Sequence, residues 1–235
     1  MTLVTLSRQL GAGGSEVAAG VANALSLRVV DRETVDSAAR EAGVPEAALH
    51  ELGFEGRRGL VERILDALRA SPAIPSVVEM QRRDSIATLR LPRAMFTPAR
   101  PLLSAAMEEY VRMVGMVIRD IARRGGVLII GQGSQVILKD RAEALHVQIV
   151  APVARRVETR MRIEGVAQSA AMQLIRASDR ARADYLRRYY GVNWLDPQLH
   201  DLVVNTGRTS VQTAVGLIVL AQRQRVIPDG LADVR

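Results

Sequence analysis

The sequence predicts an α/β fold in which a central parallel sheet carries helices on both faces. Short apolar segments rich in β-branched residues alternate along the 235-residue chain with longer segments whose apolar residues recur at helical spacing. One short segment, Val127–Ile130, is the continuous apolar run that a strand buried on both faces requires. Alternation of this kind is typical of strands joined by crossover helices, and such strands run parallel.

Composition excludes several classes of protein. The chain has no cysteine, which excludes a disulfide framework, cysteine metal sites and thiol catalysis. Its apolar runs are too short to span a bilayer and it opens directly into a predicted strand, so we expect a cytoplasmic protein with no membrane partner. The net charge of +7 is carried almost wholly by arginine, but aromatic residues make up only 3%. Stacking platforms for nucleic acid are therefore unlikely to form, and a small phosphorylated ligand is favoured over a polymer.

The first predicted strand, Leu3–Leu6, leads through a glycine-rich loop into a predicted helix. The loop contains Gly11, Gly13 and Gly14, and apolar residues then recur at helical spacing from Val17 onward. When a glycine loop joins a strand to a helix, backbone N–H groups and the N-terminus of the helix converge on an anion. The segment therefore predicts a phosphate site, with a tight turn that binds no ligand as the alternative.

The loop matches the nucleotide-binding P-loop pattern only in part. When Gly13 is aligned with the second glycine of that pattern, Ser15 takes the magnesium-binding hydroxyl position. Arg8 then replaces the first glycine and Gly14 replaces the lysine, while the only lysine of the chain, Lys139, lies far away in sequence. If phosphates bind here, an arginine must supply the positive charge, and Arg8 at the end of the strand is the candidate.

The remaining elements follow in order. We expect further strands at Leu27–Asp31, Val127–Ile130, Ala144–Val150 and Asp201–Asn205. We expect helices at Arg32–Ala42, Pro101–Arg124, Gln135–Leu138, Pro152–Glu164, Ala167–Tyr189 and Ser210–Arg223. Between these elements, residues 45–100 contain helical pieces broken by glycine and proline and no predicted strand. The prediction is one domain: a core of residues 1–44, 101–151 and 191–235, a helical insertion at 45–100, and an arginine-rich lid at 152–190.

Two features outside the first loop suggest ligand contacts. The turn at residues 131–134 follows a buried strand, so it is expected at the same sheet edge as the first loop, with Gln132 as a site residue or an ordinary turn residue. In the lid, Arg156 and Arg160 share one helix face, where like charges repel unless a polyphosphate lies between them. Asp179 and Arg182 are close enough to pair. A solvated surface is the alternative for these charges.

Taken together, these residues resemble the cytidylate kinase-like family of P-loop proteins. The resemblance rests on Ser7-Arg8-Gln9-x-Gly11-x-Gly13-Gly14, Ile130-Gly131-x-Gly133, Asp179-x-x-Arg182 and Asp201-Leu202-x-x-Asn205-Thr206. It spans nearly the whole chain, and only residues 45–100 match loosely. The resemblance implies a P-loop NTPase fold of the nucleoside-monophosphate-kinase type: a three-layer core, a helical acceptor-binding insertion and a helical lid.

The resemblance also implies an activity: transfer of the γ-phosphate of ATP, or another nucleoside triphosphate, to a nucleoside monophosphate or other small acceptor. Mg²⁺ would be held through Ser15, and the donor phosphates by Gly11, Ala12, Gly13, Gly14, Ser15 and Glu16. The predicted catalytic residues are Arg8, Arg156, Arg160, Arg182 and Asp179. The predicted acceptor-binding residues are Asp31, Arg90, Arg93 and Gln132.

The chain departs from the family pattern at two positions, and alternatives stay open. It lacks the P-loop lysine of nucleotide kinases proper, and Gln132 stands where relatives commonly have an arginine. A nucleotide sensor with weak or no transfer, a kinase of a non-nucleotide acceptor and an arginine-rich nucleic-acid binder are the alternative functions. A homodimer is an open alternative to a monomer.

Overall fold

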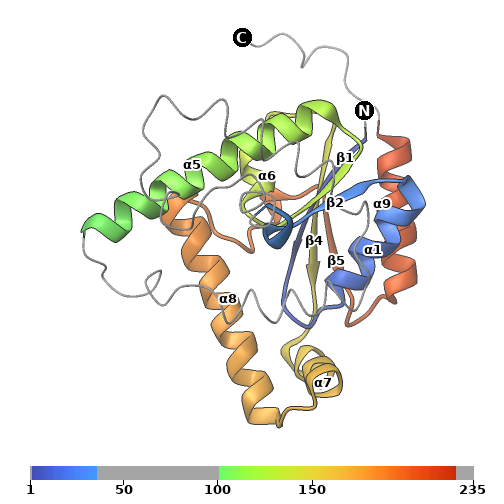
Figure 1. Cartoon of the computed structure of the whole chain (residues 1–235). Coiled ribbons are helices and arrows are strands. Elements are labelled where there is room, and N and C mark those ends of the chain that lie inside the picture. Colours follow the sequence, from blue (N-terminus) through green and yellow to red (C-terminus); the bar gives the residue numbers. More distant parts are fainter. Residues whose placement is uncertain (1, 36–100, 226–235) are drawn as a thin grey trace.

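The computed structural model describes residues 2–35 and 101–225, and within them it contains one five-stranded sheet (Figure 1). All recorded strand pairs are parallel, and the strand order is β2-β3-β1-β4-β5. The strands are β1 (Leu3–Arg8), β2 (Arg28–Val30), β3 (Val127–Ile130), β4 (Ala144–Val150) and β5 (Leu202–Asn205). The predicted parallel α/β fold is therefore confirmed, with the strand that precedes the glycine loop at the centre of the sheet.

The helices lie close to the positions expected from the sequence. They are α1 (Gly14–Leu25), α5 (Pro101–Arg124), α6 (Ser134–Ile137), α7 (Val153–Glu164), α8 (Gln168–Tyr190) and α9 (Val211–Gln224), with a short 3₁₀ helix at Pro197–Leu199. Residues 32–35 are helical, as predicted. The rest of that helix and the predicted insertion at 45–100 lie outside the described residues.

Two apolar clusters cover the two faces of the sheet because alternate residues of each strand point to opposite sides. On β1, Leu3 packs into a cluster with α5, and Val4 packs into a cluster with α1 and α9. Figure 1 shows α1 and α9 side by side on one side of the sheet and α5 on the other. The three predicted layers are therefore present.

The strand order brings two glycine turns to one edge of the sheet. Leu6 of β1 pairs with Ile130 of β3, so both strands end side by side. The N–H of Gly131 donates to the carbonyl of Leu6 at 3.0 Å, which ties the second turn to the central strand. Beyond the same edge, α7 and α8 project as a helical hairpin (Figure 1). Ligands of parallel α/β sheets bind beyond such carboxyl ends, so this edge is where a site is expected.

Candidate active site

The glycine loop between β1 and α1 has the backbone that an anion-binding turn needs. Gly11 (φ 81°) and Gly13 (φ 70°) are both left-handed, a conformation that costs other residues energy. Gly13 is the N-cap of α1, so the first N–H groups of that helix have no carbonyl partner within it. Gly14, Ser15 and Glu16 form this first turn, with Ser15 buried.

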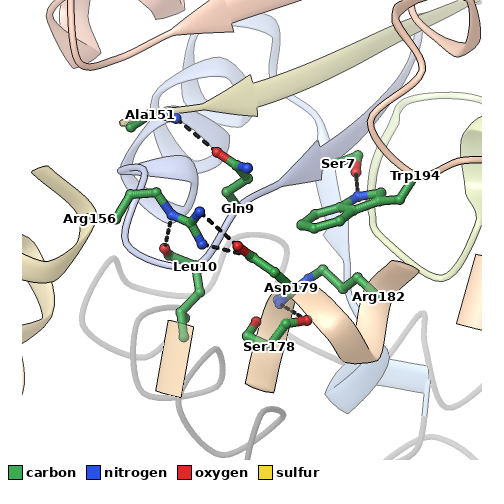
Figure 2. A network of polar contacts seen from close by, with 9 residues as sticks. All are labelled: Ser7, Gln9, Leu10, Ala151, Arg156, Ser178, Asp179, Arg182 and Trp194. Atoms are coloured by element: carbon green, nitrogen blue, oxygen red, sulfur yellow. Dashed lines mark hydrogen bonds and ion pairs between the residues drawn. The ribbon is translucent and has the colours of Figure 1, made fainter. Parts of the chain in front are cut away.

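Groups from three other segments hold the loop from outside, namely two side chains and one backbone N–H. Arg156 Nε donates to the carbonyl of Leu10 at 2.8 Å (Figure 2). Thr206 Oγ1 donates to the carbonyl of Ala12 at 2.7 Å. The side-chain carbonyl of Gln9 accepts a hydrogen bond from the N–H of Ala151 at 3.0 Å. Two loop carbonyls are thus engaged by protein donors, and the N–H of Ala12 donates to the carbonyl of Gln9 at 3.2 Å. The polar groups best suited to a ligand are therefore the N–H groups at the start of α1.

Arg8 and Gly14 fit together at the position where the P-loop pattern has its lysine. A Cβ atom added to Gly14 would lie 2.7 Å from both Cβ and Cδ of Arg8, and 3.0 Å from its Cγ. The stem of Arg8 therefore fills the space that any side chain at position 14 would enter. Glycine at position 14 and arginine at position 8 are one steric unit, which places the stem of a permanently charged side chain against the start of α1.

Arg156 is held by bonds within the protein, and its predicted contact with phosphate stays a prediction. Its side chain is only 1% exposed, and Nη1 and Nη2 donate to the two carboxylate oxygens of Asp179 at 2.9 and 2.6 Å, while Nε serves Leu10 (Figure 2). These bonds use three of the five N–H groups of the guanidinium and fix its orientation inside the protein. Arg156 therefore supports the glycine loop from behind.

Arg160 is also paired within the protein, and its predicted contact with phosphate likewise stays a prediction. It is 2% exposed and forms an ion pair with Glu164 one turn further along α7. The predicted repulsion between Arg156 and Arg160 is removed by carboxylates of the protein, so no polyphosphate between them is needed to explain the pair.

Arg182 lies where α8 meets the end of β1. It donates to the carbonyl of Ser178 at 3.4 Å, and its guanidinium carbon is 5.9 Å from the ring centre of Trp194. Trp194 in turn donates to Ser7 Oγ at 3.0 Å (Figure 2). Asp179, expected to pair with Arg182, has both carboxylate oxygens bonded to Arg156. The sequence analysis assigned no role to Trp194, although it is the only tryptophan of the chain.

The second turn combines backbone strain with unpartnered polar atoms. Gly131, Gln132 and Gly133 are all left-handed, and Gln132 (φ 58°) is the only one of them with a side chain. Both polar atoms of the Gln132 amide are buried without a hydrogen-bond partner. A Cβ on Gly133 would lie 2.7 Å from the Tyr190 ring, so α8 packs directly on this turn. Burial raises the pKa of Tyr190, which keeps its hydroxyl protonated.

The remaining predicted residues divide into one that caps a helix and two that are not described. Asp31 lies at the end of β2 and is 6% exposed, and its Oδ1 accepts from the backbone N–H of Thr34 at 2.8 Å. This bond caps the helical residues 32–35 and commits at least one carboxylate oxygen to the protein. Arg90 and Arg93 lie outside the described residues.

Two further observations concern metals and membranes. Among residues 2–35 and 101–225, no group of three or more histidine or acidic side chains is arranged to hold a metal ion. A Mg²⁺ site built from Ser15 and the phosphates of a ligand needs no such group. No helix in these same ranges combines the length and the apolar character that crossing a membrane demands.

Comparison with known proteins agrees with the fold and with the glycine loop. The chain is 33% identical over 106 residues to a cytidylate kinase of Aeropyrum pernix, which covers 45% of this chain and 61% of that kinase. It is 30% identical over 132 residues to a uronate isomerase of Corynebacterium glutamicum, covering 54% of this chain and 25% of that protein. The chain thus spans less than two thirds of either relative. An uncharacterized protein from Eubacterium ventriosum has the same fold, with a TM-score of 0.63, 18% identity and coverage of 95% and 99% of the two chains.

The family model for the cytidylate kinase-like family matches residues 3–208, which include the glycine loop, the turn at 131–134 and helices α7 and α8. This match covers most of the 235 residues, and it agrees with the parallel sheet and its glycine loop. It supports a nucleotide kinase-like role and leaves the acceptor open. The chain belongs to the cytidylate kinase-like family.

Proposed function

We propose that the protein is a cytoplasmic phosphotransferase that moves the γ-phosphate of ATP, or another nucleoside triphosphate, to a nucleoside monophosphate or other small phosphorylated acceptor. The observation that carries this proposal is the steric fit of Arg8 against Gly14. A positively charged side chain whose stem lies against the start of α1 is suited to a phosphate-binding loop that lacks the lysine. Family membership supports the same reaction class.

Each part of the loop has a role in this proposal. Phosphoryl transfer requires mainly positioning and charge stabilisation. We assign the donor phosphates to N–H groups of the glycine loop and the first turn of α1 other than that of Ala12, which donates to the carbonyl of Gln9 at 3.2 Å. Arg8 places its charge beside these phosphates. Ser15 is the residue we expect to ligate Mg²⁺, which neutralises phosphate charge when bound.

On the acceptor side, Gln132 and Arg182 are the described residues that we propose to contact substrate. The Gln132 amide offers one donor and one acceptor, and both atoms lack a partner within the protein. Arg182 is partly exposed beside Trp194 at the end of β1. A neutral amide binds the polar edge of a planar group better than it binds a phosphate, so Arg182 is the residue that we assign to the acceptor phosphate.

The test substitutes Arg8 and Gly14 singly and together. Arg8→Ala should lower the rate of phosphate transfer about a hundredfold or more, because it removes the positive charge that stabilises the transferred group in this proposal. Arg8→Ala combined with Gly14→Lys should recover most of that loss, since the lysine enters the volume that Arg8 vacates. Gly14→Lys alone should be inactive because it collides with the Arg8 stem. The control is Arg176→Ala, which removes an exposed arginine of α8. A near-normal rate in Arg8→Ala would overturn the assignment.

Binding can be measured before any acceptor is known. A ligand present at about 100 times its Kd adds roughly 2.7 kcal/mol to the free energy of unfolding. For a chain of this size the melting temperature should rise by roughly 5–10 °C. With Mg²⁺ present, a rise with a triphosphate and with one monophosphate supports a two-substrate kinase and identifies the acceptor. No rise with any nucleotide contradicts the proposal.

A nucleotide-binding sensor, or a kinase of a non-nucleotide acceptor, is the second candidate. It is favoured by the commitment of Arg156 and Arg160 to carboxylates and by the neutral side chain of Gln132. These features reduce the number of arginines that reach a transferred phosphate. A rise in melting temperature with triphosphate alone would favour this candidate, and turnover with a screened acceptor would separate its two forms.

A further inference from the structure

The guanidinium of Arg156 joins three segments that are far apart in the sequence. Its own helix is α7, its two Nη atoms bind Asp179 of α8, and its Nε binds the carbonyl of Leu10 in the glycine loop (Figure 2). A planar guanidinium fixes the directions of all three bonds, which a lysine ammonium cannot do. A displacement of Asp179 is therefore transmitted to the orientation of the Leu10 carbonyl.

The two ends of this link differ in exposure. The Arg156 side chain is 1% exposed, whereas the Asp179 side chain is 31% exposed. The arginine is enclosed between α7 and the loop, and the carboxylate lies at the border of the solvent-accessible space. The end that a ligand or a movement of α8 reaches first is thus Asp179, and the end that responds is the loop.

The loop and the start of α7 form one rigid unit at this point. A Cβ on Gly11 would lie 2.7 Å from the carbonyl oxygen of Arg156 and 3.1 Å from its Cα, so the two backbones are in direct contact. The Leu10 side chain packs in an apolar cluster with Val157 of α7 and Ile175 of α8. Leu10 is therefore anchored through both its side chain and its carbonyl.

A second contact links α8 to the strand that precedes the loop. One turn beyond Asp179, Arg182 lies over Trp194, whose indole N–H is bonded to Ser7 of β1. Near its C-terminal end, α8 packs on the 131–134 turn through Tyr190. The same helix thus contacts the glycine loop, the end of β1 and the second turn.

We propose that Arg156 is a positioning residue that couples α8 to the glycine loop, so that the Arg156–Asp179 ion pair sets the conformation in which the loop binds phosphate. This inference rests on the proposed function only for the identity of the ligand. The coupling itself is a property of the protein without ligand.

Its test compares amide hydrogen exchange in the ligand-free variants. Asp179→Asn removes the charge that holds Arg156, and Arg156→Lys keeps the charge but loses the forked geometry. In both variants, amides of residues 9–14 should exchange about tenfold faster or more, because a charge-assisted bond that holds the loop is weakened. Amides of residues 131–134 and of β3 should keep their rates. The control is Asp184→Asn, which removes the partner of the exposed Arg187 on the same helix.

Further arms separate coupling from a general loss of stability. The double variant Arg156→Lys with Asp179→Asn should exchange no faster at residues 9–14 than the single variants do, because both substitutions break one link. Additive effects, unchanged exchange at 9–14, or faster exchange spread over β3 and α5 would each overturn the proposal. If Arg156→Lys does not fold, Asp179→Asn alone decides by the same criteria.

A separate kinetic measurement requires an active protein. Where transfer is measurable, Asp179→Asn should raise the KM for the triphosphate about tenfold with a smaller change in kcat, as expected for a residue that shapes the loop without touching the reacting atoms. A fall in kcat with unchanged KM would contradict the positioning role. Absence of transfer in the unchanged protein would contradict the proposed function, whereas the exchange result would still decide the coupling.

Discussion

The two glycine turns at the carboxyl edge of the sheet have almost the same backbone but different support. Gly13 (φ 70°, ψ 16°) and Gly133 (φ 73°, ψ 15°) are both left-handed N-caps, one of a 12-residue helix and the other of a 4-residue helix. In the first turn, side chains of Arg156 and Thr206 hold the loop carbonyls. In the second, the polar side-chain atoms of Gln132 are buried without a partner.

This difference separates two ways of preparing a binding site. The first turn is already organised without a ligand, so it is suited to an anion bound through backbone N–H groups. The second turn keeps a strained residue and an unsatisfied amide, which lower stability unless a ligand or ordered water bonds to them. We therefore expect the first turn to tolerate substitution poorly and the second to gain stability when its polar side chain is removed.

The largest effect on stability is expected from alanine at the glycines of the two turns. Gly11→Ala should lower the free energy of unfolding by about 3 kcal/mol, since it combines a left-handed backbone with a Cβ 2.7 Å from the backbone carbonyl oxygen of Arg156. Gly133→Ala should cost less, about 2 kcal/mol, because its Cβ meets the Tyr190 ring, and a side chain shifts more easily than a backbone. Urea unfolding measures both. A larger loss in Gly133→Ala would reverse the comparison.

A smaller effect of opposite sign is expected at Gln132. Gln132→Gly should raise the free energy of unfolding by about 1 kcal/mol, because it removes both the left-handed strain and the unpartnered amide. Gln132→Ala removes the amide but keeps the strain, so it should be less stable than the glycine variant. If the amide binds substrate, both variants should bind the phosphate acceptor about tenfold more weakly. Destabilisation by both variants would show that the amide has a structural partner.

The smallest effect is a pH dependence at His146 of β4. Burial lowers the pKa of His146 below its usual 6.5, with the nearby Asp201 opposing the shift. The unfolded chain therefore binds a proton before the folded one does, so stability is full above about pH 6.5 and falls as the pH drops from there through the folded pKa. The loss from this residue is at most about 1.4 kcal/mol per pH unit.

His146→Gln tests this dependence, because glutamine does not titrate and can still bond to Thr5, whose hydroxyl lies 2.7 Å from His146 Nδ1. Unfolding between pH 5 and pH 8 should show a flatter profile in the variant. His200, whose pKa burial also lowers, should retain its own part of the slope. An unchanged profile would show that groups other than His146 cause the loss of stability at low pH.

Much of the fold followed from local patterns, and less of the site did. The strand predicted at Val127–Ile130 has the bounds of β3, and the helix predicted at Pro101–Arg124 has those of α5, because burial on a regular element leaves a readable period. The bonds of Arg156 to Asp179 and Leu10 were not predicted, because charge patterns do not reveal the partner of a charge. Thr206 belonged to a quoted motif without a role, and only its bond to the Ala12 carbonyl shows one.

The sequence alone determined the order of strands and helices along the chain, the glycine loop at the end of the first strand and the absence of the P-loop lysine. These are local features, set by hydrophobic period, by glycine conformation and by residue identity. Tertiary structure decided that Arg8 fills the space at Gly14 and that Arg156 binds Asp179, 23 residues away, and Leu10, 146 residues away. Such contacts depend on how α7 and α8 pack against the sheet edge, and that packing leaves no periodic trace in the chain.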